Sequence, residues 1–371
     1  MRATISLVKG DGIGVDVSDA AMFLAQKAMS KAGIPAPEII EIAAGAKYYA
    51  ETGVDIEPDG EKRAGAADAI FLGAIGLPQI RHADGTEISP HLRLRDRYQL
   101  YAGIRPVKAY PNTPMPLADS RASKIDLVII RESTEGLFYS AAVHGRSKVI
   151  DNAVCDETLR ITRATTEKLH DFAFRFAGKR KAKGHTGQVT CVDKANVFTS
   201  MAFFRQIFDE VSAHYPDISK TYNYVDAAAL DLIRQPWAAD VLVMENMFGD
   251  ILSDLAGGLV GGMGMAACGE IGDEIGLFQP AHGSAPDIMG MDKANPLAAI
   301  LSAGLMLDYL AEKLHQPAYE DAAIILDAAI EAGFSLNRLR PMEFGGDMGT
   351  KAVTLAISSL MDDRVNQPHL I

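Results

Sequence analysis

Apolar runs of strand length alternate with longer amphipathic stretches along the chain, and this alternation indicates an α/β fold. A first strand is predicted at residues 3–9, followed by a glycine-containing turn at 10–14 and a helix to about residue 31. Further strands are predicted at 69–74, 125–132, 188–193, 222–226 and 240–245. Long helices are predicted at about 157–177, 198–213, 296–313 and 318–332. The segment at about 140–155 has no helical period and could form an arm used in subunit contact.

Two glycine-rich segments suggest nucleotide binding, because glycines let a backbone approach a phosphate. In residues 10–14 the glycines alternate, and Val15 stands where the Rossmann fingerprint G-x-G-x-x-G needs its third glycine. Residues 257–264 are not followed by the Lys-Ser/Thr of a P-loop. Neither segment matches a standard nucleotide loop, and we interpret the second as a flexible turn after a helix.

The chain has 371 residues, of which 48% are hydrophobic and 23% charged, so it is long enough for two domains with buried cores. Its three cysteines, Cys155, Cys191 and Cys268, lie far apart without metal-ligand spacing. This favours core thiols in a reducing compartment over disulfides or a zinc site. No apolar run reaches the roughly 18 residues of a membrane helix, and the first strand begins without a charged leader. We expect a cytoplasmic protein.

The net charge of −12 argues against nucleic acid as a partner, because a nucleic-acid-binding protein needs a basic face. The basic cluster of the chain is expected to be a solvated loop and comprises Lys179, Arg180, Lys181 and Lys183. The expected partners are therefore small molecules rather than nucleic acids or membranes.

Three aspartates are candidate ligands for a divalent metal. Asp250 and Asp254 are four residues apart among good helix formers, so both side chains lie on one helical face. Such a pair repels by roughly 0.3 kcal/mol on a helix and often lies on a solvated face, but a bound Mg²⁺ or Mn²⁺ would turn the repulsion into attraction. Asp226 follows a predicted strand and would supply a third carboxylate. Together with substrate oxygens, the three carboxylates would fill an octahedral site.

Five segments together resemble one family. They occur in the order expected for the isocitrate and isopropylmalate dehydrogenases, which are β-decarboxylating dehydrogenases, and the resemblance runs from about residue 5 to 355. The segments are Lys-Gly-Asp-Gly-Ile-Gly at 9–14, Asp-Lys-Ala-Asn-Val at 193–197, Tyr-Val-Asp at 224–226, Asn-Met-Phe-Gly-Asp-Ile-Leu-Ser-Asp at 246–254 and His-Gly-Ser-Ala-Pro-Asp at 282–287. The joint occurrence of such long motifs is far more specific than any one of them.

The resemblance implies a two-domain, non-Rossmann α/β fold of the isopropylmalate dehydrogenase type. A large cofactor-binding domain would be built from both chain ends, residues 1–100 and 261–371. A small dimerisation and metal-binding domain would comprise residues 101–260. The resemblance also implies a homodimer whose active sites are shared across the interface.

Arginines would allow this acidic chain to hold a 2-hydroxy diacid, because arginine offers planar, bidentate donors to carboxylates. Arg95, Arg105 and Arg131 match the positions that grip the malate portion of the substrate in the family. The family reads the substituent at C3 with the turn that precedes Arg95 and with the residue after Lys-x-Asn. The implied substrate contacts are Arg95, Arg105, Arg131, Ser89, His91, Leu92, Asn196 and Val197.

The resemblance also implies the chemistry. Asp226 from the neighbouring subunit would complete the metal site with Asp250 and Asp254, and the metal would lower the pKa of the C2 hydroxyl. Lys194, also from the neighbour, would act as general base or as its proton relay. Hydride would leave C2 for the nicotinamide ring, and the resulting 3-carboxy-2-keto acid would lose CO₂.

Protonation of C3, the last step, is associated in the family with a tyrosine after the Arg-Glu motif. The aligned residue here is Phe138, and Tyr139 is next to it. Either Tyr139 reaches the site as a catalytic acid, or water or Lys194 delivers the proton, or the step is impaired. Neighbouring residues of a strand point to opposite faces, so replacement by Tyr139 does not follow from the sequence.

The cofactor is expected to be NAD. Asp287 stands where a carboxylate can accept both ribose hydroxyls and repel the 2′-phosphate of NADP. NADP-dependent members tend to carry a Lys-Tyr pair where this chain has Asp287 and Ile288. Gln279 replaces a common glutamate, which makes the contact on the nicotinamide side less secure. The implied cofactor contacts are Ile13, His282, Gly283, Ser284, Ala285, Asp287, Ile288 and Asn295.

The substrate is predicted to be 3-isopropylmalate, with isocitrate, tartrate and D-malate as alternatives. Ile88, Leu92 and Val197 could enclose an isopropyl group, whose burial is worth roughly 2 kcal/mol. Ser89 and His91 instead match hydrogen-bonding positions of isocitrate enzymes. The proline between Ser89 and His91 is expected to break the helical start found in relatives.

A function of another class also stays open, that of a catalytically weak relative that binds nucleotide or serves as a regulatory subunit. Phe138 and Gln279 favour this alternative. The presence of three metal aspartates, Lys194 and three arginines argues against it, because a subunit freed from catalysis would be expected to lose some of them.

Overall fold

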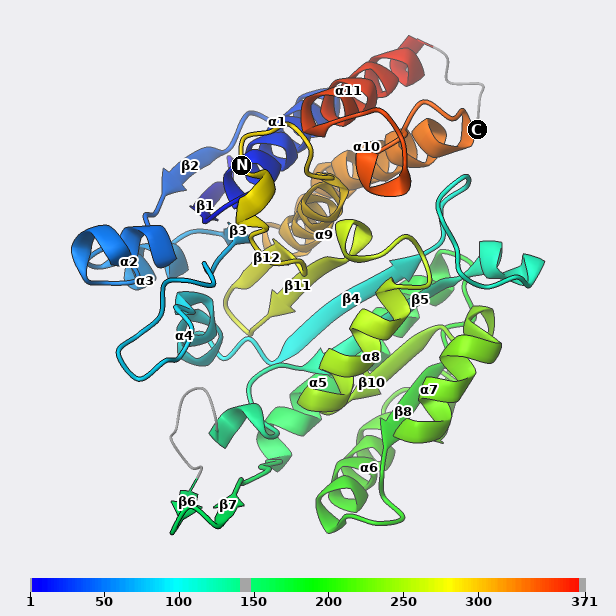
Figure 1. Ribbon diagram of the computed structural model, residues 1–371. Coiled ribbons are helices and arrows are strands. Elements are labelled where there is room, and N and C mark those ends of the chain that lie inside the picture. The colour runs from blue at the N-terminus through cyan, green and yellow to red at the C-terminus, as the bar shows by residue number, and fades with distance from the viewer. Residues whose placement is uncertain (1, 141–147, 367–371) are drawn as a thin grey trace.

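A computed structural model describes residues 2–140 and 148–366 of the chain. Its main sheet is built from β1 (Thr4–Gly10), β2 (Glu38–Glu41), β3 (Ala69–Ala74), β4 (Ala102–Lys108), β5 (Asp126–Glu132), β8 (Val189–Asp193), β9 (Lys220–Tyr224), β10 (Val241–Met244), β11 (Ala267–Ile271) and β12 (Gly276–Pro280). These ten strands lie in the order β2-β1-β3-β12-β11-β4-β5-β10-β8-β9 and cross the whole molecule (Figure 1).

The sheet is mixed. Three neighbouring pairs in its middle, β12 with β11, β11 with β4 and β4 with β5, are antiparallel. The pairs on either side of them are parallel. The chain therefore forms two parallel halves joined by antiparallel strands, and the predicted α/β fold class is confirmed.

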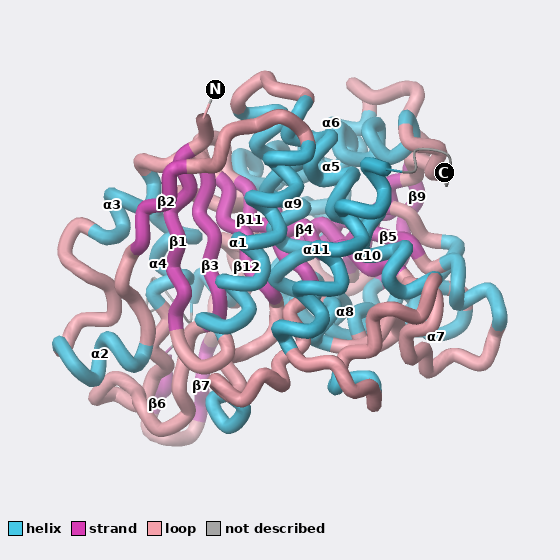
Figure 2. Tube along the Cα trace, turned by 90° about the horizontal axis from the view of Figure 1, so that it is seen from above, coloured by secondary structure: helices cyan, strands magenta, loops and turns pink. Residues whose placement is uncertain are grey.

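Helices cover both faces of the sheet, as the continuous apolar runs of strands such as β3 require. The helices are α1 (Gly14–Lys31), α2 (Ala46–Thr52), α3 (Gly60–Gly65), α4 (Pro90–Arg97), α5 (Arg163–Ala182), α6 (Thr199–Ser212), α7 (Val225–Arg234), α8 (Asn246–Gly257), α9 (Leu297–Lys313), α10 (Ala318–Ser335) and α11 (Thr350–Asn366). Figure 2 shows α1, α9, α10 and α11 side by side over one part of the sheet, with α5 and α6 farther along.

The two faces of the sheet differ in how their cores are arranged. On the first face, one continuous apolar cluster joins the sheet to α1, α5, α6, α9, α10 and α11. On the second face the apolar contacts form two separate clusters, one under α3 and α4 and the other under α7 and α8. Alternate residues of each strand face opposite sides of the sheet, so second-face residues of the central strands β11, β4 and β5 lie between these two clusters.

Most of the predicted elements are confirmed, and two helix boundaries are corrected. The helix predicted to begin near residue 157 begins at Arg163, because the Thr162 side chain accepts a hydrogen bond from the backbone N–H of Thr165 and caps the helix. The same helix continues to Ala182, so the basic cluster at 179–183 is its last turn rather than a loop. Cations are favourable at the carboxyl end of a helix, and Arg180 also pairs with Asp240.

Two further predictions are corrected at the starts of helices. The strand predicted at 222–226 ends at Tyr224, and Asp226 lies in the first turn of α7, where the helix dipole favours a carboxylate. Pro90 does not break the helix before Arg95 but begins it. The first helical position suits proline because its missing N–H would have no partner there.

The segment predicted as an arm contains a small hairpin outside the main sheet. Strands β6 (Lys148–Ile150) and β7 (Val154–Asp156) pair in an antiparallel manner, and Val149 and Val154 are more than half exposed. Residues 141–147 of the segment lie outside the described residues. Among the helices of the described chain, none combines the length and the apolar character needed to cross a membrane.

Candidate active site

Two of the three predicted arginines meet around a buried glutamate on the second face of the sheet. Arg95 comes from the last turn of α4 and Arg105 from β4, and both are less than 10% exposed. Their Nη2 atoms lie 2.9 and 3.1 Å from Oε1 of Glu270 on the neighbouring strand β11. Burial alone would raise the pKa of Glu270, but the charges of Arg95 and Arg105 lower it to about 2. Glu270 is therefore an ionised part of this cluster.

Arg131 connects the arginines to the predicted metal ligands. It lies near the end of β5, where its Nε and Nη2 donate to Oδ1 of Asn246 at 3.0 and 2.7 Å, and it also pairs with Asp250 on α8. Gly249 allows this approach, since a Cβ there would lie 2.5 Å from the Arg131 side chain. The sequence analysis assigned Arg131 and Asp250 to one site, and the structure adds that the two side chains contact each other directly.

Asp250 and Asp254 lie on α8 as predicted, on one side of the helix. The pKa of Asp254 is raised by partial burial and by the negative charge of Asp250. Two neighbouring carboxylates of this kind fit a bound cation, which would relieve their repulsion. Asp226 is not beside them, and within the described part of the chain no three acidic, histidine or cysteine side chains are grouped to hold a metal.

Asp226 instead pairs with Lys194, which follows β8. The next residues, Asn196 and Val197, are exposed, and Val197 shows 60% of its surface to solvent. The structure therefore gathers four predicted site residues, Lys194, Asn196, Val197 and Asp226, into a second group apart from the arginines and Asp250.

Phe138 and Tyr139 contact different arginines in the structure. The Phe138 ring lies 5.1 Å from the guanidinium carbon of Arg131. The Tyr139 hydroxyl accepts a hydrogen bond from Arg160, whose guanidinium lies over the Tyr139 ring. Phe138 thus contacts the arginine group, while the role of Tyr139 as a catalytic acid stays a prediction.

The turn predicted to read the C3 substituent adjoins the arginine cluster. Ser89 precedes α4, and His91 and Leu92 lie in its first turn, all of them half-buried. His91 stands one helical turn before Arg95, so the two side chains share a helix face. Burial and the positive charge of Arg95 lower the pKa of His91 to about 3, which makes it a neutral hydrogen-bonding group. Among the described residues, Nδ1 of His91 has no partner.

The predicted cofactor residues form a compact loop between β12 and α9. The N–H of Ile13 donates to the carbonyl oxygen of Ser284 at 2.7 Å, and the Ser284 hydroxyl donates to the carbonyl of Gly76. Gly12 has a φ of +56°, and a Cβ there would lie 1.9 Å from the Ser284 carbonyl oxygen. Gly12 thus allows close contact between the two loops, whereas Gly10 and Gly14 lie against the backbone of Ala74 at the end of β3. These contacts explain why the glycine spacing differs from a Rossmann fingerprint.

The rest of the cofactor group surrounds this contact. His282 bonds the Gly283 carbonyl through Nδ1 at 2.9 Å, and its buried Nε2 has no partner among the described residues. Asp287 is exposed, next to Ile288 in a short 3₁₀ turn after Ala285. Asn295 donates a hydrogen bond to Oε2 of Glu343 at 2.8 Å, and its side-chain oxygen accepts one from the backbone N–H of Leu297 at the start of α9. A buried imidazole nitrogen and an open carboxylate are suitable groups for a nucleotide.

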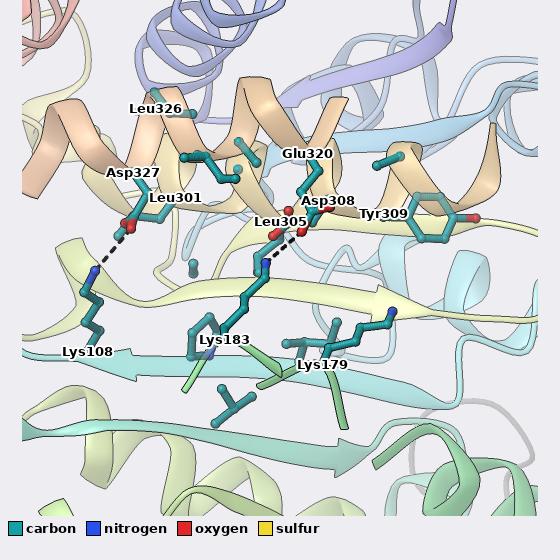
Figure 3. A pocket seen from close by; sticks show the side chains of 18 of the residues that line it. Lys108, Lys179, Lys183, Leu301, Leu305, Asp308, Tyr309, Glu320, Leu326 and Asp327 are labelled. Atoms are coloured by element: carbon teal, nitrogen blue, oxygen red, sulfur yellow. Dashed lines mark hydrogen bonds and ion pairs between the residues drawn. The ribbon is translucent and has the colours of Figure 1, made fainter. Parts of the chain in front are cut away.

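A large cavity of the described structure lies away from this site. It has a volume of about 2090 Å³ and lies between α5 and the helices α9 and α10. Figure 3 shows Lys108 and Lys183 pointing across it toward Asp327 and Glu320, with ion-pair distances of 3.1 and 3.0 Å. Its sheet lining comes from Tyr101, Ile104 and Lys108 and their neighbours, whereas Arg105 points to the opposite face. The predicted site residues do not line it.

Comparison with known proteins places this geometry in a family. The chain matches the Isocitrate/isopropylmalate dehydrogenase family over residues 4–357. It is 40% identical over 347 residues to a 3-isopropylmalate/3-methylmalate dehydrogenase of Methanocaldococcus jannaschii, covering 93% of this chain and 95% of that one. It is 37% identical over 355 residues to the homoisocitrate dehydrogenase of the same organism, covering 94% and 95%.

A solved structure confirms the fold type. The isocitrate dehydrogenase of Methylococcus capsulatus superposes with a TM-score of 0.81 at 32% identity, covering 97% of this chain and 99% of that chain. The predicted non-Rossmann fold of the isopropylmalate dehydrogenase type is thereby confirmed. The chain belongs to the isocitrate/isopropylmalate dehydrogenase family and is a β-decarboxylating dehydrogenase.

Proposed function

We propose that the chain catalyses the NAD-dependent and metal-dependent oxidative decarboxylation of a malate-type 2-hydroxy diacid, with 3-isopropylmalate as the first candidate. The observation that carries this proposal is the group of three buried arginines next to Asp250. A buried arginine group needs anionic partners, and planar guanidiniums suit carboxylates. The relative named 3-isopropylmalate/3-methylmalate dehydrogenase supports the substrate assignment.

In this mechanism Arg95, Arg105 and Arg131 bind the substrate carboxylates and orient the C2–H bond. Lys194 takes the proton of the C2 hydroxyl, and a proton must later return to C3. A divalent metal at Asp250, Asp254 and Asp226 of the partner subunit would lower the pKa of the C2 hydroxyl and draw electrons from the new ketone, while NAD would accept the hydride. Phe138 cannot donate a proton, so we propose that water or Lys194 supplies it, with Tyr139 free to do so only after leaving Arg160.

We propose a homodimer because the site residues fall into two groups within one chain. Lys194 and Asp226 pair with each other, apart from Asp250 and the arginines. Exposed apolar side chains on the intervening helices support an interface: Leu230 and Ile233 on α7 and Ile251 on α8 are between 43% and 59% exposed. A second copy would bury these side chains and bring the two groups together.

NAD is the proposed cofactor because Asp287 is exposed at the loop that carries His282. In this arrangement the carboxylate would accept ribose hydroxyls and repel a 2′-phosphate. A large domain of residues 1–100 and 261–371, a small domain of residues 101–260 and a cytoplasmic location stay predictions that accompany this proposal.

An assay of NAD reduction with Mn²⁺ tests the proposal across 3-isopropylmalate, isocitrate, D-malate and tartrate. Turnover of at least one of these acids, lost in EDTA, is the expected result. The alternative of a catalytically weak nucleotide-binding relative draws support from the Phe138 contact with Arg131. That alternative would be favoured by binding of NAD without turnover of any acid in the panel.

A further inference from the structure

Glu270 is a charged residue in the substrate site that the family resemblance did not indicate. It is fully buried on β11, a strand that is hydrogen-bonded on one side to β12 and on the other to β4. In the register of that pairing Glu270 stands opposite Gly103, whose missing side chain leaves room for the carboxylate. Because the strand is fixed on both sides, the Glu270 carboxylate is a permanent part of the site.

This carboxylate already occupies part of the binding capacity of two substrate arginines. Its Oε1 lies 2.9 Å from Arg95 and 3.1 Å from Arg105, so the two guanidiniums share one negative charge. The pair keeps one net positive charge, which balances one substrate carboxylate. The Nε atoms of Arg95 and Arg105 have no partner among the described residues and are available as donors to it.

The turn that would read the C3 substituent adds no further cation. Ser89 and Leu92 are uncharged, and His91 is neutral above a pH of about 3. Glu270 lies close to the helix that carries this turn, since its Oε1 is 2.9 Å from Nη2 of Arg95, one helical turn after His91. The two other arginines of α4 are committed elsewhere, since Arg93 bonds Asp55 and Glu61, and Arg97 lies 3.1 Å from Glu61.

A carboxylate on the C3 substituent would therefore approach Glu270 with no positively charged side chain left to neutralise it. The ion pairs of Glu270 with the arginines are made by Oε1, and the Ser133 hydroxyl that also stabilises the carboxylate is uncharged, so the charge is only partly neutralised on the Oε2 side. Like charges in a site of low dielectric repel strongly, and repulsive groups of this kind are a general means of substrate discrimination.

We propose that Glu270 is a specificity-determining residue that excludes substrates with a third carboxylate at C3 and restricts the enzyme to dicarboxylic 2-hydroxy acids. This proposal rests on the proposed function of the arginine site. It selects 3-isopropylmalate, tartrate and D-malate over isocitrate and homoisocitrate, and it assigns the selection to a charge rather than to the shape of the C3 pocket.

The test is Glu270→Gln, which keeps the size of the side chain and an acceptor oxygen for the arginines but removes the charge. We expect the ratio of kcat/KM for isocitrate to kcat/KM for 3-isopropylmalate to rise at least about tenfold over the wild-type ratio. A ratio measured on one preparation is independent of the fraction of active enzyme, so partial loss of folding does not obscure it. Glu270→Asn serves as a second neutral variant.

Glu132→Gln is the matched control. Glu132 is also a buried carboxylate of the central strands, but it accepts hydrogen bonds from the backbone of Thr134 and Glu135, each at 2.7 Å, instead of from arginines. The substrate ratio should stay unchanged in this variant, whatever its absolute activity.

A wild-type enzyme that prefers isocitrate, or a ratio unchanged by both neutral substitutions, would overturn the assignment of Glu270. If no acid is turned over, the proposed function fails, and calorimetric titration with isocitrate and D-malate in the presence of Mn²⁺ tests Glu270 separately. In that case Glu270→Gln should raise the affinity for isocitrate relative to D-malate at least about tenfold. Equal changes for both acids would overturn the proposal.

Discussion

At the scale of single residues, Asp250 has two partners of opposite kind, the arginine to which it pairs and the aspartate that shares its helix face. We predict that Asp250→Asn lowers kcat at least about a hundredfold, because an amide is a weak ligand for Mg²⁺ or Mn²⁺. Since the Asp250 side chain is 46% exposed, the fold should persist, and circular dichroism should match that of the wild type. Full activity of the wild type in EDTA would contradict a role as metal ligand.

Asp287 sets the predicted cofactor preference. It is exposed, so a ribose can reach its carboxylate without displacing a buried partner. We predict that kcat/KM for NAD exceeds that for NADP at least about tenfold, which corresponds to ~1.4 kcal/mol of transition-state binding. Asp287→Ser should reduce this preference, and steady-state kinetics with both cofactors measure it. Equal values for NAD and NADP in the wild type would show that Asp287 has no such role.

Glu132 should make stability depend on pH. Burial raises the pKa of its carboxyl from 4.5 to about 7 in the folded protein. Below pH 4.5 Glu132 is protonated in both the folded and the unfolded state. Between pH 4.5 and 7 only the unfolded state releases this proton, which favours unfolding, so the folded protein loses stability as the pH rises through this range. The full loss is about 3 kcal/mol. Denaturation of wild type and Glu132→Gln at several pH values measures it, and parallel curves for the two proteins would contradict the prediction.

The sequence indicated most of the residues that the structure assembles, but not Glu270. Arg95 and Arg131 stand in recognisable motifs, whereas Glu270 lies alone in a short run of small residues. Only the pairing of β11 with β4, which are far apart in the sequence, brings it to Arg105. The same holds for the Arg131–Asp250 pair, because contacts between distant elements are not encoded in local spacing.

At the scale of elements, the strands with continuous apolar runs were predictable and the short central strands were not. Strand β3 is buried at all six positions and reads as a strand from its sequence alone. Strands β11 and β12 contain glycine and proline, which disfavour strands locally, and their pairing with each other and with β3 and β4 stabilises them. Tertiary pairing therefore decides the centre of the sheet, where the candidate active site lies.

The start of α5 offers a test of helix capping. The Thr162 hydroxyl accepts from the backbone of Thr165 at 3.4 Å and donates to Glu135 at 2.6 Å, which ties the helix to the loop after β5. We predict that Thr162→Ala lowers the free energy of unfolding by about 1 kcal/mol. Thr162→Ser keeps the hydroxyl and should recover most of the loss in urea denaturation. A serine variant as unstable as the alanine variant would assign the effect to the methyl group.

At the scale of the whole molecule, one sheet separates the buried arginine site from the cavity of Figure 3. The arginine site lies on the second face, between α4 and α8, and the cavity of Figure 3 lies on the first, between α5 and α9. Ion pairs that cross the cavity, such as Lys183 with Glu320, connect helices of opposite halves of the sheet but are about half exposed. Exposed pairs contribute little to stability, typically under about 1 kcal/mol each. The continuous strands therefore fix the relation of the two halves more than these pairs do.

The separation of Lys194 and Asp226 from Asp250 leads to the prediction that each active site needs two subunits. Lys194→Ala and Asp250→Asn should each be inactive alone, because each homodimer lacks one residue in both of its sites. Refolding the two variants together should produce about half mixed dimers, in which one site has both intact residues and the other has neither. With independent sites, this predicts recovery of roughly a quarter of the wild-type activity.

The recovered activity should come only from dimers that contain one subunit of each variant. It should follow the proportion of mixed dimers seen by native electrophoresis, and it should be absent when the two variants are combined without refolding, because the subunits then cannot exchange. A double variant with Lys194→Ala and Asp250→Asn in one chain, refolded with the wild type, is the matched control. Its mixed dimers carry two sites that each lack one residue, so they should add no activity beyond that of the remaining wild-type dimers. If mixed dimers form from the single variants and stay inactive, Lys194 and Asp250 belong to the same subunit's site.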